Sequence, residues 1–242
     1  MKKFLIFLAI CLLFFNSFRV EVNNQTLSKK YNVYLDQSII DESNKLLMLQ
    51  VGVVEKPKDS NWGPEVSKYI MSTGIKYAVS YCGSGQYWCL KESAKAAGID
   101  PIIGIPFVAR KAASALYWFT KGQEVGTLTT FIPEVNDIVV WRNTRSAGKG
   151  HVGRIIETGQ LGWVKTVEFN TSSGQSGSQD NGGGVYIRSR NLNGMLGALA
   201  IKGLVGLKPI KKLDTVHIVS VPVHRPHRKH IVPNHNHRKF VR

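Results

Sequence analysis

The part of the chain between residues 137 and 207 constrains the fold most, because short β-type runs alternate there with turn residues. Five runs rich in β-branched and aromatic residues occupy positions 137–141, 151–157, 163–169, 184–189 and 201–207. Gly, Ser and Asn fill the connections between them. This pattern is typical of successive strands joined by turns, so the second half of the chain is predicted to form a sheet.

The first half has the periodicity of helices instead. Helices are expected at positions 39–51, 64–74, 89–97 and 109–120. Pro64 suits a first helical turn, and Gly74 suits the end of that helix. Residues 20–36 are polar and mixed, which predicts a linker. Helices followed by strands predict an α+β domain, with the N-terminal helices packed on an antiparallel sheet.

The N-terminus has the features of an export signal. Lys2 and Lys3 precede an apolar run from Phe4 to Phe15, as in a secretory signal peptide. The run is shorter than the about 20 residues that a spanning helix needs, yet no small-residue cleavage motif follows it. Residues 1–20 are therefore interpreted as a signal peptide or as an N-terminal membrane anchor through residues 4–20. Either interpretation predicts a secreted, periplasmic or cell-envelope protein.

The charge of the chain is strongly basic and uneven. The 242 residues include 32 Lys and Arg against 16 Asp and Glu, a formal net charge of +16. Residues 208–242 hold nine basic residues and one acidic residue. The net charge of this segment is therefore +8, half of the total of +16. We expect residues 211–242 to be a disordered, His-rich basic tail that could attach to an anionic cell-wall polymer or to a membrane surface. Nucleic acid is not expected as a partner, because export and the lack of a recognised binding motif oppose it.

The histidines of the tail do not predict a metal site. The stretch HRPHRKH spaces three histidines at intervals of three, but no cysteine or acidic ligand accompanies them and a proline interrupts the stretch. We therefore predict no metal and no cofactor for this chain.

A count of side chains limits which residues can perform thiol chemistry. Of seven histidines, six lie in the tail, so His151 is the only candidate base in the folded part. Two cysteines, Cys82 and Cys89, follow the apolar run. Cys89 is predicted to begin a helix, where unpaired N–H groups and the positive end of the helix dipole stabilise a thiolate. The same N–H groups can receive an oxyanion during acyl transfer. Cys82 is predicted to serve in packing.

A third group should orient the imidazole of a catalytic histidine. If runs 151–157 and 163–169 form a hairpin, Glu168 and Asn170 return to the end where His151 lies. The two residues are two positions apart, so both side chains should point to the same face. The candidate catalytic residues are therefore Cys89, His151, Glu168 and Asn170.

Several stretches together resemble the CHAP domain, a family of cysteine- and histidine-dependent amidohydrolases and peptidases related to the NlpC/P60 and papain-like folds. These are YWCLKESAKAAG, DIVVW, GHVGRIIETG, VKTVEFNTSSG and GGGVYIRSR. The resemblance spans residues 45–210 and implies a papain-like catalytic domain that cleaves amide bonds of bacterial peptidoglycan. The activity would be that of a cysteine endopeptidase or of an N-acetylmuramoyl-L-alanine amidase, without a cofactor.

Carried over by position, the resemblance implies Cys89 as nucleophile, His151 as base, Glu168 as orienting acid and Asn170 as the polar residue beside it. The sequence departs from the family at two positions, since Asn136 and Phe169 stand where relatives often have glycine. Asn136 should be tolerated if its turn does not need a positive φ. The ring of Phe169 would lie near the site and affect substrate preference.

The expected organisation is a leader at 1–20, a linker and first helix start at 21–44, a catalytic domain at 45–210 and a tail at 211–242, in a monomer. One alternative is a non-catalytic wall-binding or scaffold protein of the same fold. In that case the site would be idle, or a disulfide between Cys82 and Cys89 would lock it.

Overall fold

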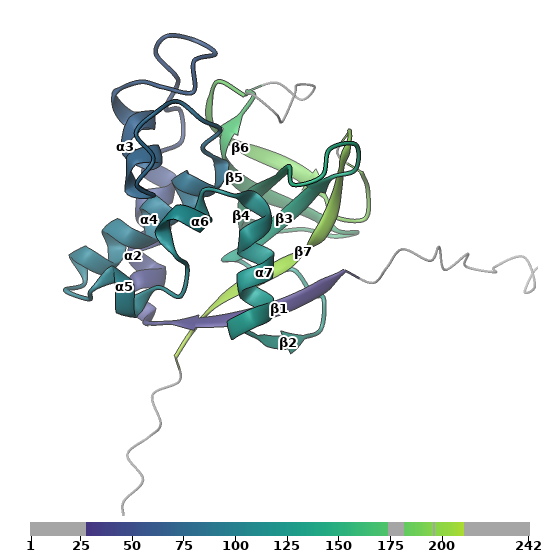
Figure 1. The fold of residues 1–242 in the computed structure, drawn as a ribbon. Helices are drawn as coiled ribbons and strands as arrows, with labels where there is room; N and C mark the ends of the chain where they lie inside the picture. Colours follow the sequence, from purple (N-terminus) through teal and green to yellow (C-terminus); the bar gives the residue numbers. More distant parts are fainter. Residues whose placement is uncertain (1–27, 174–181, 196, 211–242) are drawn as a thin grey trace, which may run out of the picture. The chain divides into compact units, whose positions relative to one another are not determined.

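Seven strands form one mixed sheet in the order β2-β1-β7-β3-β4-β5-β6 (Figure 1). The computed structural model describes residues 28–173, 182–195 and 197–210. The strands are β1 (Lys29–Leu35), β2 (Thr127–Thr129), β3 (Asp137–Asn143), β4 (Gly150–Thr158), β5 (Trp163–Thr171), β6 (Gly184–Asn191) and β7 (Leu199–Pro209). The predicted leader at 1–20 and tail at 211–242 lie outside the described residues. Within the described ranges, no helix is both long and apolar enough to span a membrane.

All five strands predicted from the sequence are present, as β3 to β7. The sheet is mixed, however, because β1 pairs in parallel with β7, and the prediction of an antiparallel sheet is wrong in this respect. Residues 29–35 were predicted as linker because their composition is polar. Val33 and Leu35 are buried nonetheless, and the buried Lys30 forms ion pairs with Glu134 and, at 2.8 Å, with Asp137. The folded unit therefore includes residues before position 45.

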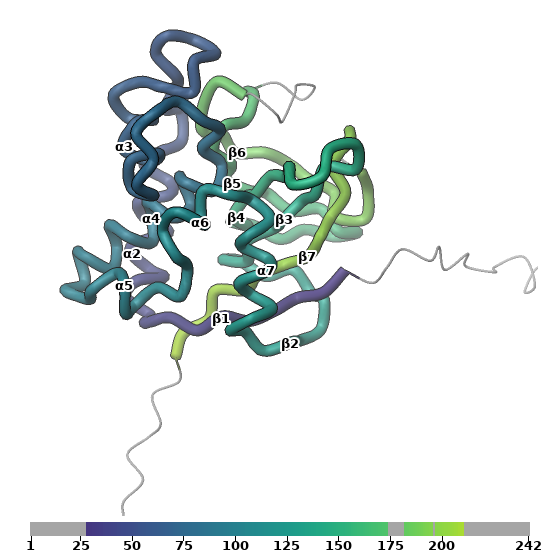
Figure 2. Tube along the Cα trace, viewed as in Figure 1, coloured from purple at the N-terminus to yellow at the C-terminus, as the bar shows by residue number. Residues whose placement is uncertain are grey.

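Helices cover this sheet from one side, and one of them supports the candidate site. They are α2 (Gln37–Leu49), α3 (Pro64–Ser72), α4 (Cys82–Ala96), α5 (Pro101–Gly104), α6 (Ala109–Ala112) and α7 (Ala115–Val125). Helices α2 and α3 pack against α4, which lies against β4 and β5, while α7 crosses β1, β3 and β7 (Figure 2). The predicted helix at 109–120 is divided into α6 and α7 by Ala113 and Ser114.

Helix α4 begins at Cys82, so the prediction of a helix start at Cys89 is wrong. Gly83 and Gly85 lower helix propensity, which concealed the first two turns in the sequence. Tertiary packing requires both glycines, because a Cβ at Gly83 would overlap the carbonyl oxygen of Ala112 and one at Gly85 would overlap the ring of Phe169. Close packing against neighbours therefore decides where this helix starts.

The two departures from the family pattern have simple structural explanations. Asn136 has a φ of 76°, so its turn does need a positive φ, and asparagine is one of the residues that adopts it most readily. Phe169 is fully buried, and its ring meets that of Tyr69 edge-on at 5.0 Å between centroids. The ring fills the core between β5 and α4 and is not exposed to a substrate.

Candidate active site

Cys82 is the first residue of α4, and Tyr81 is its N-cap. The first N–H groups of an α-helix have no partner in a preceding turn, and the helix dipole is positive at this end. Both effects stabilise a thiolate. The Cys82 side chain is therefore placed where a sulfur nucleophile and an oxyanion receptor can coexist.

His151 on β4 lies beside Cys82. Its ring is hydrogen-bonded to the Cys82 side chain, and its Nε2 lies 2.9 Å from Oε2 of Glu168. Since Nε2 faces the carboxylate, Nδ1 is the nitrogen left for the thiol. Burial by itself lowers the pKa of His151, but the hydrogen bonds with Cys82 and Glu168 outweigh it and raise that pKa to about 9. The geometry thus favours an imidazolium between a sulfur and a carboxylate.

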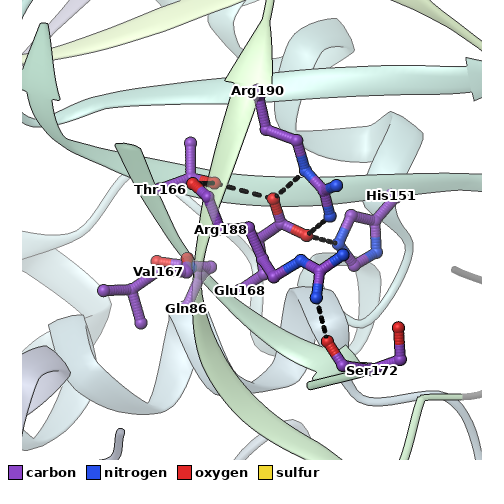
Figure 3. A network of polar contacts seen from close by, with 8 residues as sticks. All are labelled: Gln86, His151, Thr166, Val167, Glu168, Ser172, Arg188 and Arg190. Atoms are coloured by element: carbon purple, nitrogen blue, oxygen red, sulfur yellow. Dashed lines mark hydrogen bonds and ion pairs between the residues drawn. The ribbon is translucent and has the colours of Figure 1, made fainter. Parts of the chain in front are cut away.

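Glu168 is the centre of a fully buried polar network (Figure 3). Arg190 donates from Nε to Oε1 at 2.7 Å and from Nη2 to Oε2 at 2.6 Å, and Thr166 donates its hydroxyl to Oε1 at 2.7 Å. Burial raises the pKa of Glu168, but the hydrogen bonds and charges of His151 and Arg190 outweigh burial and lower that pKa to about 2. The carboxylate is therefore ionised and held in one orientation, which fixes the imidazole.

Sequence reasoning predicted the contact between His151 and Glu168, but it missed Arg190 and Thr166. The expected hairpin exists, with Gly153 opposite Glu168 in the register of β4 and β5. A weak signal for Arg190 was present, since Arg188 lies in the predicted strand 184–189 and Arg190 follows two positions later. In the structure both lie on β6 and are buried. A buried guanidinium needs acceptors, and the carboxylate of Glu168 supplies them from the neighbouring strand.

Replacing Arg190 with methionine tests the role of this pair. The variant removes two charge-assisted hydrogen bonds from Glu168, so the pKa of Glu168 should rise and the imidazole should lose its fixed orientation. We expect kcat/KM to fall roughly 10- to 100-fold, the equivalent of one or two hydrogen bonds to a charged group. Steady-state kinetics and an NMR titration of His151 measure the two effects. Arg190→Lys keeps the positive charge but cannot donate two parallel hydrogen bonds to the carboxylate, so its activity should lie between those of wild type and Arg190→Met.

Unchanged kinetics in a folded Arg190→Met variant, with the His151 titration also unchanged, would show that Arg190 is not a positioning residue.

Cys89 lies on the same helix as Cys82 but away from this network. Its side chain is fully buried, and burial raises the pKa of its thiol to about 12, although nearby Arg154 acts in the opposite direction. The structure does not bring Cys89 to His151, and the thiol lies in the helix interior instead of at its start. The prediction that Cys89 lies at the helix start beside His151 is therefore wrong, and Cys82 occupies that place.

Both cysteines are free thiols in the structure. Cys82 and Cys89 are separated by about two turns of one helix, which corresponds to about 10.5 Å along its axis. A disulfide needs Cα atoms no more than about 7 Å apart. A disulfide between Cys82 and Cys89 is thus incompatible with the geometry of α4.

Asn170 is not joined to His151 by a hydrogen bond in the described residues. A bulge between Phe169 and Thr171 interrupts the pairing of β5 with β6, and Asn170 has a φ of 54°. The strict alternation that would place Asn170 on the face of Glu168 is therefore broken. Its Oδ1 is buried and accepts no hydrogen bond from the described residues. A catalytic role for Asn170 stays a prediction.

Gln86 connects the start of α4 to the sheet. Its Nε2 donates to the carbonyl of Val167 on β5 at 3.2 Å, and its Oε1 accepts from Nε of Arg154 on β4 at 3.2 Å. Val167 adjoins Glu168, so this link holds the first turn of α4 against the strands of the network. The two hydrogen bonds of Gln86 therefore help to fix the distance between the Cys82 thiol and the His151 imidazole.

A thiol at a helix start, an imidazole beside it and a carboxylate that orients the imidazole are the elements of nucleophilic acyl transfer. In the described part of the chain, no group of three or more His, Cys, Asp or Glu side chains is arranged to hold a metal ion. Comparisons of the chain with protein-family models, with curated proteins and with solved structures gave no match.

Proposed function

We propose that this protein is a cysteine amidohydrolase or endopeptidase with a papain-like catalytic arrangement, acting on amide bonds of bacterial peptidoglycan. The observation that supports this most is the chain of contacts from Cys82 through His151 to Glu168. The substrate class comes from the resemblance to CHAP domains and agrees with an exported, basic protein. The corrected catalytic set is Cys82, His151 and Glu168, with Arg190 as a positioning residue.

In the proposed mechanism, the Cys82 thiolate attacks the carbonyl carbon of the amide. The N–H groups at the start of α4 stabilise the oxyanion that forms on the carbonyl oxygen. His151 then gives its proton to the leaving amine, and the acyl group stays on sulfur as a thioester. His151 next accepts a proton from water as the water attacks the thioester, which releases the carboxylic acid and restores the Cys82 thiolate and the His151 imidazolium.

Digestion of purified peptidoglycan followed by mass spectrometry tests the proposal. An amidase would release stem peptides from the glycan, whereas an endopeptidase would shorten or separate the peptides and leave them attached. A Cys82→Ala preparation serves as the control for contaminating hydrolases. No new fragment from wild-type protein on walls of several chemotypes would contradict the proposed substrate class.

The scaffold alternative loses one of its supports in this structure. Its locked form required a disulfide between Cys82 and Cys89, and both are free thiols on one helix. A buried, fully hydrogen-bonded carboxylate that orients a single histidine is also a costly arrangement for a protein without chemistry to perform. These observations favour the enzyme.

The paired charges of His151 and Glu168 predict a pH dependence of stability. His151 has a folded-state pKa raised from 6.5 to about 9, so its contribution is complete below pH 6.5 and is lost as the pH rises through 9. Glu168 has a pKa lowered from 4.5 to about 2, so its contribution is complete above pH 4.5 and is lost as the pH falls through 2. Stability from this pair should therefore be greatest between pH 4.5 and 6.5.

Urea unfolding of wild type and His151→Gln across this range measures the effect. The difference in unfolding free energy should shrink steadily as the pH rises from 6.5 to about 9. A difference that stays constant through that interval would mean that His151 is neutral in the folded protein.

A further inference from the structure

A cleft of about 560 Å³ lies at one end of the neighbouring strands β1, β7 and β3, beside helix α7 (Figure 1). Each strand contributes one cationic side chain to its lining: Lys29 from β1, Arg142 from β3 and Lys202 from β7. Among the described residues that line the cleft, none is Asp or Glu, so the lining carries a formal charge of +3. The cleft shares no residue with the catalytic set.

The three cations have no acidic partner. In the described residues, no hydrogen bond or ion pair joins the side chains of Lys29, Arg142 or Lys202 to a carboxylate. Exposed lysines on the helices differ, since they pair with a glutamate of the same helix, as at Lys45, Lys68 and Lys95. Like charges on neighbouring strands are unfavourable, so an anion in the cleft would stabilise this arrangement.

The backbone and one aromatic ring fix the position of Lys202. The pairing of β3 with β7 shifts between Val140 and Trp141, which leaves Lys202 without a partner on β3. Such a bulge redirects the side chain of the extra residue. Its Nζ lies 5.2 Å from the centroid of the Phe119 ring, which also lines the cleft. A cation–π contact holds an ammonium group without neutralising its charge, so Lys202 stays available to an anion.

The lining indicates which kind of anion the cleft accepts. The charged groups come from three strands, and Gln123, Thr144 and Asn193 add neutral polar groups. A phosphate diester keeps its negative charge at all ordinary pH values, and its tetrahedral oxygens accept hydrogen bonds from several directions. Arginine and lysine are the side chains that most often bind phosphate.

We infer that this cleft binds a phosphodiester group of an anionic polymer, with Lys29, Arg142 and Lys202 as its charged contacts. A membrane surface suits the cleft less well. The cations line a concave site, and among the described lining residues Met195 is the one large apolar side chain that is exposed. A polymer chain can enter such a site, whereas a flat bilayer surface cannot.

The cleft and the candidate active site share the hairpin of β3 and β4. Arg142 lies opposite Gly150, the residue before His151, and the ring of the adjacent Trp141 is 5.8 Å from that of His151. A polymer held in the cleft would therefore bring its neighbouring wall material to the strand that carries the base. The inference rests on the proposed function only in placing this polymer in the cell wall.

Calorimetric titration of the full chain with soluble poly(glycerol phosphate), and with neutral dextran as a blank, measures this binding. The test variant combines Lys29→Gln, Arg142→Gln and Lys202→Gln. It should bind poly(glycerol phosphate) roughly 10-fold more weakly than wild type, as expected for the loss of three solvent-accessible charge contacts. Thermal unfolding curves show whether the variant is folded. Arg142→Gln alone, at an exposed position, should still weaken binding about twofold.

A charge-matched variant controls for the overall basicity of the chain. It combines Lys56→Gln, Lys76→Gln and Lys111→Gln, three exposed positions away from the cleft that form no ion pair in the described structure. It loses the same three charges as the test variant, and both keep the whole basic segment 208–242. The control should bind poly(glycerol phosphate) as tightly as wild type.

Three outcomes would overturn the inference. Equal weakening in the test and control variants would mean that binding follows overall charge. Equal or tighter wild-type binding of polyglutamate of matched length would exclude a preference for phosphate. Loss of binding to phosphatidylglycerol vesicles in the test variant, with polymer binding unchanged, would make the partner a membrane. If wild type hydrolyses no wall material, the proposed function fails, but the titration still decides whether the cleft binds phosphodiesters.

Discussion

Replacing Cys82 with alanine is expected to abolish amide hydrolysis, with kcat falling by roughly a thousandfold or more, as for loss of a covalent nucleophile. Without the sulfur no thioester can form, and His151 has no proton donor to activate. The protein should still fold, because Cys82 occupies the first position of α4 and alanine is a strong helix former. Kinetics on purified peptidoglycan fragments, together with a thermal unfolding curve, measure both expectations.

Cys89→Ala is the matched control, since it removes a thiol from the same helix. Cys89 is fully buried, so the variant should lose some stability, about 1 kcal/mol for a small cavity, and keep its activity. If Cys89→Ala were inactive but folded while Cys82→Ala remained active, the proposal of Cys82 as nucleophile would be wrong.

Replacing His151 with alanine should be almost as damaging, because nucleophile and base act as one unit. The variant leaves Cys82 without a proton acceptor and leaves the leaving amine without a proton donor. Activity should fall by roughly a thousandfold. Alkylation of Cys82 by iodoacetamide, followed by peptide mass spectrometry, should slow near neutral pH, since the imidazolium that stabilises the thiolate is absent.

His217→Ala is a suitable control, because it removes a histidine of the predicted tail and leaves His151 in place. It should match wild type in both assays. Rapid Cys82 alkylation and undiminished hydrolysis in a folded His151→Ala variant would contradict the assigned base.

The sequence was sufficient where the decisive contacts are local. The β-branched runs predicted β3 to β7, and the hairpin of β4 and β5 brought Glu168 to His151 as expected, because hairpin register follows from adjacent segments. The prediction of a helix start at Cys89 was wrong for the opposite reason. The start of α4 depends on contacts of Gly83 and Gly85 with α6 and β5, which no local propensity reports.

The same limit applies to the residues that sequence reasoning missed. Strand β1 is stabilised by pairing with β7 and by the ion pairs of Lys30, and its partners lie more than 100 positions further along the chain. Arg190 reaches Glu168 only because β6 lies next to β5.

The contact between Gly85 and Phe169 means that these two positions share one fixed volume. A glycine at position 169 would leave room for a side chain at the facing position of α4. The ring of Phe169 thus fills the space that a side chain at position 85 of α4 would otherwise take. In any redesign of this protein, positions 85 and 169 should be exchanged as a pair, because either change alone produces an overlap or a void behind the first turn of α4.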